Sequence, residues 1–147
     1  MCETSAAGIA LILSGMAGMK LIDTDIAIDH FHGHHAALEY FTQTLIAGET
    51  LAISVVSLTE ILAGMRTGER ERTEKLFGLF TILEVDEEIA RKAGEYMGLY
   101  RRSQHIELAD ALIAATAFVV QAELITRNVK HYPMSDVTVE APYARGK

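Results

Sequence analysis

Short apolar runs alternate with longer amphipathic stretches along most of the chain. Apolar runs bounded by turn or cap residues are typical of buried strands, and they occur at residues 20–23, 51–54, 81–85, 124–126 and, as a candidate fifth strand, 137–139. Apolar side chains at helical spacing predict helices at residues 34–48, 55–65, 68–80, 86–102 and 106–121, with a turn or short helix at 24–30. Strands that alternate with helices pair in parallel. We therefore expect an α/β three-layer sandwich, with a central parallel sheet of four to five strands and helices on both faces.

Two of these helices can be placed more closely. The helix at residues 106–121 is apolar on almost every side, so we expect it inside the fold. Asp86 is expected to cap the helix that follows it, because Glu87 and Glu88 also suit a first turn. Ligands of parallel α/β sheets bind at the carboxyl ends of the strands. The functional site is therefore expected at that edge.

The first eighteen residues differ from the rest of the chain. Residues 8–18 are small and apolar, and no Lys or Arg precedes them. A signal peptide needs a basic start and a membrane span needs about 20 apolar residues, so neither is expected. We interpret residues 1–18 as an apolar extension upstream of a more natural start at Met19; the alternative is a short helix that packs on the domain or on a partner. Residues 19–147 are expected to form one domain of a soluble, cytoplasmic protein.

Composition excludes several classes of protein. The chain has 147 residues, of which 50% are hydrophobic and 22% charged, which is typical of a globular domain and not of a disordered chain or a coiled coil. The single cysteine, Cys2, rules out a disulfide framework and a cysteine-based zinc site. With 13 basic and 20 acidic residues the net charge is −7, which argues against coating nucleic acid by bulk charge. A local basic patch remains compatible with that balance.

Three carboxylates stand in unusually apolar surroundings: Asp23 at the end of the first strand, Glu60 and Asp110. Acidic side chains are rarely buried unless they are paired or bind a metal. Their positions at strand ends and helix starts suggest that they converge on one divalent cation. Oxygen ligands favour Mg²⁺ or Mn²⁺ over zinc. The alternative is that the three acids are independent helix caps and ion-pair partners of Arg101, Arg102 or Arg127.

Motifs of other enzyme classes are missing. The chain has no Walker A sequence and no Gly-x-Gly-x-x-Gly, so nothing supports nucleotide cradling. A calcium loop starting at Asp23 would place Ile28 where glycine is required and His34 where the closing Glu belongs. The six histidines do not form a metal motif and are interpreted as a solvated patch.

Four segments of the chain form a recognisable series: LIDTD at residues 21–25, SVVSLTEILAG at 54–64, LADALIAATA at 108–117 and LITRN at 124–128. Taken together and in order, they resemble the motifs of the PIN-domain ribonucleases, and specifically of the VapC-type toxins of type II toxin–antitoxin operons. Any one of these motifs alone would be weak. The resemblance extends from Met19 to about Val139. It implies a PIN-like sandwich and hydrolysis of RNA phosphodiester bonds that depends on Mg²⁺, or alternatively Mn²⁺.

The resemblance also implies the roles of individual acids. The catalytic and metal-binding acids of the family fall on Asp23, Glu60 and Asp110. The position two residues after the first acid is often Asn or Asp, and Asp25 fits it as an auxiliary residue. Cleavage by such a site is expected to leave a 5′-phosphate and a 3′-hydroxyl.

This sequence departs from the family after the fourth strand. Where a further acid is frequent, the chain has Asn128 and His131. Asn128 is a further candidate ligand through its amide oxygen, although it brings no charge, and Thr126 is expected to form hydrogen bonds near the site. The sequence leaves open whether the site binds one metal ion or two. It also leaves open a second function, that of a catalytically impaired PIN-fold module for protein interaction.

Contact with RNA, either tRNA or mRNA, needs basic residues around the acidic site. Arg127 and Lys130 lie next to the last motif and are the favoured substrate-binding residues. Weaker candidates are Arg66, Arg70, Arg72, Lys75, Arg101 and Arg102. Three of these, Arg70, Arg72 and Lys75, are interpreted as a solvated helix face paired with Glu69, Glu71 and Glu74.

The expected partners are a cognate antitoxin and a second copy of the chain. Apolar side chains on the helices at 34–48 and 55–65 exceed what a small sheet must cover. They are Leu38, Phe41, Leu45, Leu58, Ile61 and Leu62. Part of this surface is expected to form a groove for an amphipathic helix of the antitoxin, and another part a two-fold homodimer contact. The alternative is that all of them belong to the core.

Overall fold

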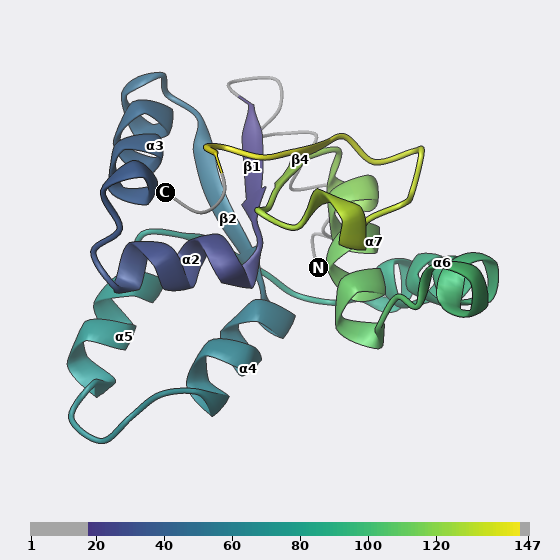
Figure 1. The fold of residues 1–147 in the computed structure, drawn as a ribbon, viewed down its shortest axis with the longest axis horizontal. Coiled ribbons are helices and arrows are strands. Elements are labelled where there is room, and N and C mark those ends of the chain that lie inside the picture. Colours follow the sequence, from purple (N-terminus) through teal and green to yellow (C-terminus); the bar gives the residue numbers. More distant parts are fainter. Residues whose placement is uncertain (1–17, 145–147) are drawn as a thin grey trace, which may run out of the picture.

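Five parallel strands lie at the centre of the fold (Figure 1). A computed structural model describes residues 18–144. The strands are β1 (Met19–Ile22), β2 (Thr50–Ser54), β3 (Thr81–Leu83), β4 (Glu123–Ile125) and β5 (Val139–Glu140), and their order in the sheet is β3-β2-β1-β4-β5. The prediction of a parallel sheet with four to five strands is confirmed. The fifth strand begins at Val139 rather than at residue 137.

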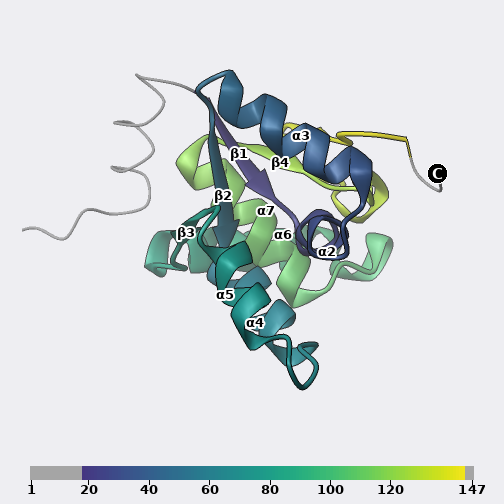
Figure 2. The same cartoon turned by 90° about the vertical axis from the view of Figure 1, so that its left-hand side faces the viewer.

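Helices cover both faces of this sheet, as the sequence predicts. They are α2 (Thr24–Phe31), α3 (His35–Ile46), α4 (Val55–Ala63), α5 (Arg70–Phe77), α6 (Glu87–Gln104) and α7 (Leu108–Val120), with a short 3₁₀ helix η1 (Val129–His131) after β4. In Figure 2, α2 to α5 lie toward the viewer, and α6 and α7 lie behind the sheet. The fold is the expected three-layer sandwich.

Each central strand contributes side chains to two hydrophobic cores, one on each face of the sheet. Successive side chains of a strand point to opposite faces. Leu21 accordingly packs with α6 and α7, whereas its neighbour Ile22 packs with α2 and α3. In the same way Leu124 joins the first core and Ile125 the second. Each core thus takes one apolar layer from the sheet, so the central strands are hydrophobic on both faces.

The helix ends follow the predicted chemistry. Asp86 caps α6, with the backbone N–H of Ile89 donating to its carboxylate at 2.9 Å. Gly48 lies just past α3 with a positive φ of 79°, the backbone conformation that a glycine at this position allows. Helix α7 is mostly buried, in agreement with its apolar sequence. Helix α6 continues to Gln104, two residues beyond the predicted end.

The topology brings the three isolated acids to one edge of the sheet. Asp23 directly follows β1, and Glu60 lies on α4, which begins where β2 ends. Helix α7 precedes β4 and runs back toward its start, so the first turn of α7, with Asp110, lies at the carboxyl edge of the strands (Figure 1). This is the edge at which parallel sheets bind ligands.

Two expectations concern the ends of the chain and membranes. Apart from Gly18, the proposed extension at residues 1–18 lies outside the described residues. None of the helices within residues 18–144 is long and apolar enough to cross a membrane.

Candidate active site

Asp23 is the most tightly held acid of the site. It is the N-cap of α2, and its Oδ1 accepts a hydrogen bond of 2.7 Å from the backbone N–H of Thr24. Its Oδ2 accepts two more, from the hydroxyls of Thr126 and Tyr132, each at 2.8 Å. The residue is only 8% exposed. Donors on three sides therefore fix the carboxylate in one orientation.

Asp25 lies two residues further along the chain and is held by the segment that follows β4. Its Oδ2 accepts hydrogen bonds from the backbone N–H of Arg127 at 3.1 Å and from Nδ2 of Asn128 at 3.0 Å. Burial, and after it the charge of Asp23, raises the pKa of Asp25 to about 6, against the opposing effect of Arg127. Its Oδ1 is buried and has no hydrogen-bond partner among the described residues.

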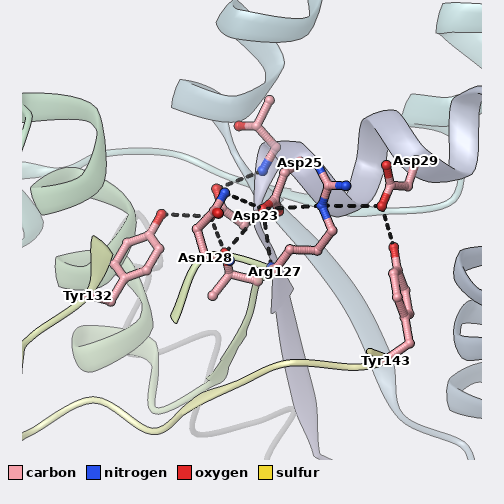
Figure 3. Close-up of polar contacts among 9 residues, drawn as sticks. Asp23, Asp25, Asp29, Arg127, Asn128, Tyr132 and Tyr143 are labelled. Atoms are coloured by element: carbon pink, nitrogen blue, oxygen red, sulfur yellow. Dashed lines mark hydrogen bonds and ion pairs between the residues drawn. The ribbon is translucent and has the colours of Figure 1, made fainter. Parts of the chain in front are cut away.

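Arg127 lies between two carboxylates of α2 (Figure 3). Its Nε is 3.8 Å from Oδ2 of Asp25 and 3.4 Å from Oδ2 of Asp29. These are ion-pair contacts, since this N–H makes no hydrogen bond within the described part of the chain. Tyr143 completes the arrangement by donating to Asp29 Oδ2 at 2.7 Å. The Nε of Arg127 is therefore directed at acids of its own chain, and its predicted contact with RNA stays a prediction.

Glu60 reaches the site from α4 and is exposed. It is joined to the start of α2 because the hydroxyl of Thr24 lies 2.5 Å from Glu60 Oε1 and 2.9 Å from Ser57 Oγ. The neighbouring Thr24 backbone N–H binds Asp23. Glu60 also lines a cavity of about 170 Å³ between α2, α4 and α5, with mainly apolar walls that include Ile28 and Phe31.

Asp110 approaches from the first turn of α7. Its carboxylate accepts from the backbone N–H of Glu107 at 3.3 Å, as part of a capping box. Burial raises its pKa; the hydrogen bond from Glu107 opposes this shift, and the charge of Asp23 adds to it. A polar cavity of about 180 Å³ adjoins it, lined also by His105 and His131. His131, which stands where the family often has an acid, therefore neighbours the third acid of the site.

The residues suit a hard divalent ion in their chemistry. All the candidate ligands are carboxylate or amide oxygens, and the charge of Asp23 raises the pKa of both Asp25 and Asp110, so a cation between them would relieve repulsion. Within residues 18–144, however, no three His, Cys, Asp or Glu side chains lie close enough together to hold an ion directly. Mg²⁺ uses few carboxylates and keeps several waters. A metal shared by Asp23, Glu60 and Asp110 therefore stays a prediction.

The alternative interpretation of the acids holds in part. Asp23 and Asp110 do act as caps, but neither forms an ion pair with an arginine among the described residues. Thr126 and Asn128 lie where the sequence places them, next to Asp23 and Asp25. Asn128, however, turns its amide nitrogen rather than its oxygen toward Asp25.

Sequence reasoning missed three contributors to the site: Tyr132, Asp29 and Tyr143. The buried Tyr132 and the half-buried Tyr143 lie in irregular segments that carry no periodic signal, and Asp29 belongs to none of the motifs in the sequence. The acidic residues at 23, 25 and 29 were the one hint that α2 presents carboxylates to the sheet edge.

The other candidate substrate-binding residues differ in their surroundings. Lys130 is exposed on η1 and makes no ion pair within the described part of the chain. Lys75 pairs with Glu71 on its own helix at 3.6 Å, as expected of a solvated face. Arg72 does not pair with a glutamate as expected. It donates to the carbonyl of Phe31 at 2.7 Å and lies 4.3 Å from the centre of that ring, so it attaches α5 to the end of α2.

Comparison with known proteins agrees with this fold and these motifs. The chain is 44% identical over 127 residues to ribonuclease VapC10 of Mycobacterium tuberculosis, covering 86% of this chain and 94% of that protein. Among solved structures, a toxin–antitoxin complex from Klebsiella pneumoniae is 30% identical with a TM-score of 0.68, covering 85% of this chain and 98% of that one. VapBC2 from Rickettsia felis, bound to a promoter DNA fragment, has the same fold, with a TM-score of 0.72 at 19% identity, over 84% of this chain and 98% of that one.

The family match is continuous. Residues 20–136 match the PIN domain, from the first residue after Met19 to the segment beyond Tyr132. That range contains all three isolated acids and the residues that hold them. The chain belongs to the PIN-domain family.

Proposed function

We propose that this protein is a metal-dependent endoribonuclease toxin that hydrolyses RNA phosphodiester bonds and is neutralised by a cognate antitoxin. The observation that carries the proposal is the position of Asp23: a buried carboxylate fixed by three donors, whose charge raises the pKa of Asp110. The 44% identity to a protein named as a ribonuclease supports the same activity. We place the protein in the cytoplasm, where tRNA and mRNA are available.

Each acid has a distinct part in this proposal. Asp23 and Asp110 are the ligands of Mg²⁺, or Mn²⁺, and Glu60 completes the set from the exposed side. When bound, the ion supplies the Lewis acidity that ionises a water near neutral pH and offsets charge on the phosphate. Tyr132 and Thr126 keep the Asp23 carboxylate from rotating. Thr24 positions Glu60 relative to the start of α2.

Cleavage of RNA under controlled metal supply tests the activity. Purified protein incubated with bulk tRNA should cut it in Mg²⁺, stop in EDTA and resume when Mg²⁺ is restored, leaving 5′-phosphate ends. Asp110→Asn, prepared in the same way, is the control for a contaminating nuclease and should be inactive. If wild type and this variant cut equally, or if EDTA has no effect, the metal mechanism is wrong. Absence of any cutting by the wild type would favour the interaction module.

The proposed antitoxin site is the apolar cavity beside Glu60. Of the apolar side chains expected to serve partners, Ile61 lines this cavity and Phe41 is buried in the core, whereas Leu38, Leu45 and Leu62 are 39%, 49% and 40% exposed outside the cavity walls. A partner helix seated there would reach the acidic site with a cation, most simply an arginine, which would substitute for the charge of the metal. The relative from Klebsiella pneumoniae is described as a toxin–antitoxin complex.

Co-expression with the neighbouring open reading frame, followed by size-exclusion chromatography, tests both partners. We expect one complex that contains both proteins and lacks ribonuclease activity, and a homodimer when the chain is expressed alone. Met65→Asp, in the wall of the cavity beside Glu60, should weaken the complex, while Leu99→Asp, at an exposed leucine of α6 on the other side of the sheet, should not. A monomer that ignores the neighbouring product would contradict the assignment as a toxin.

A further inference from the structure

Arg127 is placed as a fixed counter-ion inside the acidic site. Its Nε lies 3.4 Å from Asp29 and 3.8 Å from Asp25, and both carboxylates are largely shielded, with 13% and 14% of their side chains exposed. Tyr143 donates to the same oxygen of Asp29 that faces the guanidinium. In Figure 3 the guanidinium lies between the two acids, with Tyr143 on the far side of Asp29. One cation is thus shared by two carboxylates of α2.

The same segment satisfies Asp25 from a second direction. The backbone N–H of Arg127 and the side-chain amide of Asn128 both donate to Asp25 Oδ2. The other oxygen of Asp25 is buried. With the Arg127 guanidinium in place beside these contacts, a hydrated divalent ion, which gives up its waters reluctantly, cannot reach this carboxylate. In the folded chain Asp25 is therefore a structural residue and not a metal ligand.

Asn128 fits this arrangement better than the acid that the family often carries nearby. An aspartate at this position would turn a second carboxylate toward Asp25 Oδ2, which now receives the Asn128 amide at 3.0 Å. Like charges at that distance repel, and a second cation would be needed to hold them together. With Asn128, the amide adds a hydrogen bond without adding charge, and the Arg127 guanidinium supplies the positive charge from the protein itself.

We propose that Arg127, assisted by Asn128, takes the place of a second divalent ion, so that the centre binds one ion per chain. Arg127 is then a positioning residue rather than a phosphate-binding residue. The inference rests on the proposed function, because it presumes the ion held by Asp23, Glu60 and Asp110. It answers how many ions the centre holds, which the sequence leaves open.

Counting bound Mn²⁺ on the metal-free full-length chain tests this. Free Mn²⁺ is measured by electron paramagnetic resonance during titration of the wild type, Arg127→Lys and Arg127→Gln. We expect one ion per chain in the wild type and in Arg127→Lys, which keeps the charge, and two in Arg127→Gln, which removes the guanidinium from between Asp25 and Asp29. Arg91→Gln is the matched control, since that exposed arginine pairs with Glu87 of its own helix; it should bind one ion.

The outcomes separate this inference from the proposed function. A wild type that binds no Mn²⁺ would overturn the metal centre itself and the inference with it. Two ions in the wild type, or one ion in a folded Arg127→Gln, would overturn only the inference. If Arg127→Gln is unfolded without metal and folds on adding Mn²⁺, an ion has replaced the guanidinium, as proposed. If it stays unfolded in Mn²⁺, no ion can replace Arg127 and the inference fails.

Discussion

The hydroxyl of Tyr132 donates to Oδ2 of Asp23 over 2.8 Å, between two residues that are both buried. Burial, together with the charge of Asp23, raises the pKa of Tyr132, so the phenol stays protonated and remains a donor. Thr126 donates to the same oxygen. The first acid of the site is therefore oriented by side chains that arrive after β4, which couples the last part of the chain to the chemistry at β1.

Tyr132→Phe should show what this hydrogen bond contributes. Because a hydrogen bond to a charged group is worth about 1.5–3 kcal/mol, we expect a loss of unfolding free energy in that range. We also expect weaker Mn²⁺ binding, by about 10–100-fold, as is typical when a group that orients a metal ligand is removed. Urea unfolding and Mn²⁺ titration measure the two effects.

Tyr96→Phe is the matched control for that variant. Tyr96 is also buried and donates to a carboxylate, Asp136, at 2.7 Å, but on the α6 side of the fold. It should lose stability without any change in Mn²⁺ affinity. Equal metal affinity in both variants would mean that Tyr132 is only structural.

Asp23 and Asp110 are predicted to differ in what their removal does to folding. Asp110→Asn should abolish cleavage of RNA and leave the unfolding free energy nearly unchanged, because the amide oxygen can still accept from Glu107 while repulsion with Asp23 disappears. Asp23→Ala should abolish cleavage too, but it strands the donors Thr24, Thr126 and Tyr132. Each unsatisfied buried donor costs about 1–3 kcal/mol, so this variant should be clearly destabilised. Activity assays alongside urea unfolding check both; an active Asp110→Asn would remove Asp110 from the site.

The sequence predicted where the three acids lie better than it predicted the contacts around them. Asp23, Glu60 and Asp110 could be placed together because the order of strands and helices alone sends them to the carboxyl ends of a parallel sheet. The role of Arg127 could not be predicted in this way. Its partner Asp29 is remote in the sequence, and a basic residue beside a polar motif suits a phosphate contact as well as an internal ion pair.

The bounds of strands and helices were likewise predictable where local residues determine them, and not where contacts between distant segments do. The central strands follow from apolar runs, while the start of α6 and the end of α3 follow from Asp86 and Gly48, whose effects are local. The start of the fifth strand differs by two residues from its predicted position because its pairing with β4 depends on how the irregular segment after η1 packs. Contacts of that kind leave no periodic pattern in the sequence.

Asp25 predicts a pH dependence of stability in the metal-free protein. Its pKa is raised to about 6 in the folded chain, against about 3.9 for an unfolded aspartate, so the folded state binds the proton more tightly. Its contribution to stability is therefore present at low pH, is lost as the pH rises from about 4 to about 6, and stays constant above that. Asp25→Asn should remove this part of the slope when urea midpoints are compared at several pH values.

Asp136→Asn is the control of opposite sign. Burial opposes the shift, but hydrogen bonds from Tyr96 and Lys92 lower the pKa of Asp136, so its contribution to stability is lost as the pH falls. If the plots of urea midpoint against pH for Asp25→Asn and the wild type run parallel from about pH 4 to about pH 7, folding does not raise the pKa of Asp25.

Lys130 and Arg127 should respond differently to salt when RNA binds. Lys130 is exposed on η1 close to the acidic site, whereas the Arg127 guanidinium already contacts Asp25 and Asp29. When a protein gives up one lysine–phosphate interaction with a single strand, the slope of log affinity against log salt falls by about 0.7 in magnitude. We therefore expect Lys130→Gln to lower that slope and to weaken the binding of all RNA sequences about equally, and Arg127→Gln to leave the slope unchanged.

Fluorescence anisotropy with a labelled oligoribonucleotide in EDTA, at several KCl concentrations, measures both slopes. Arg91→Gln is the control for simple loss of a surface charge. A lowered slope for Arg127→Gln would return that residue to the RNA-binding surface and show that its ion pairs with α2 open when substrate arrives.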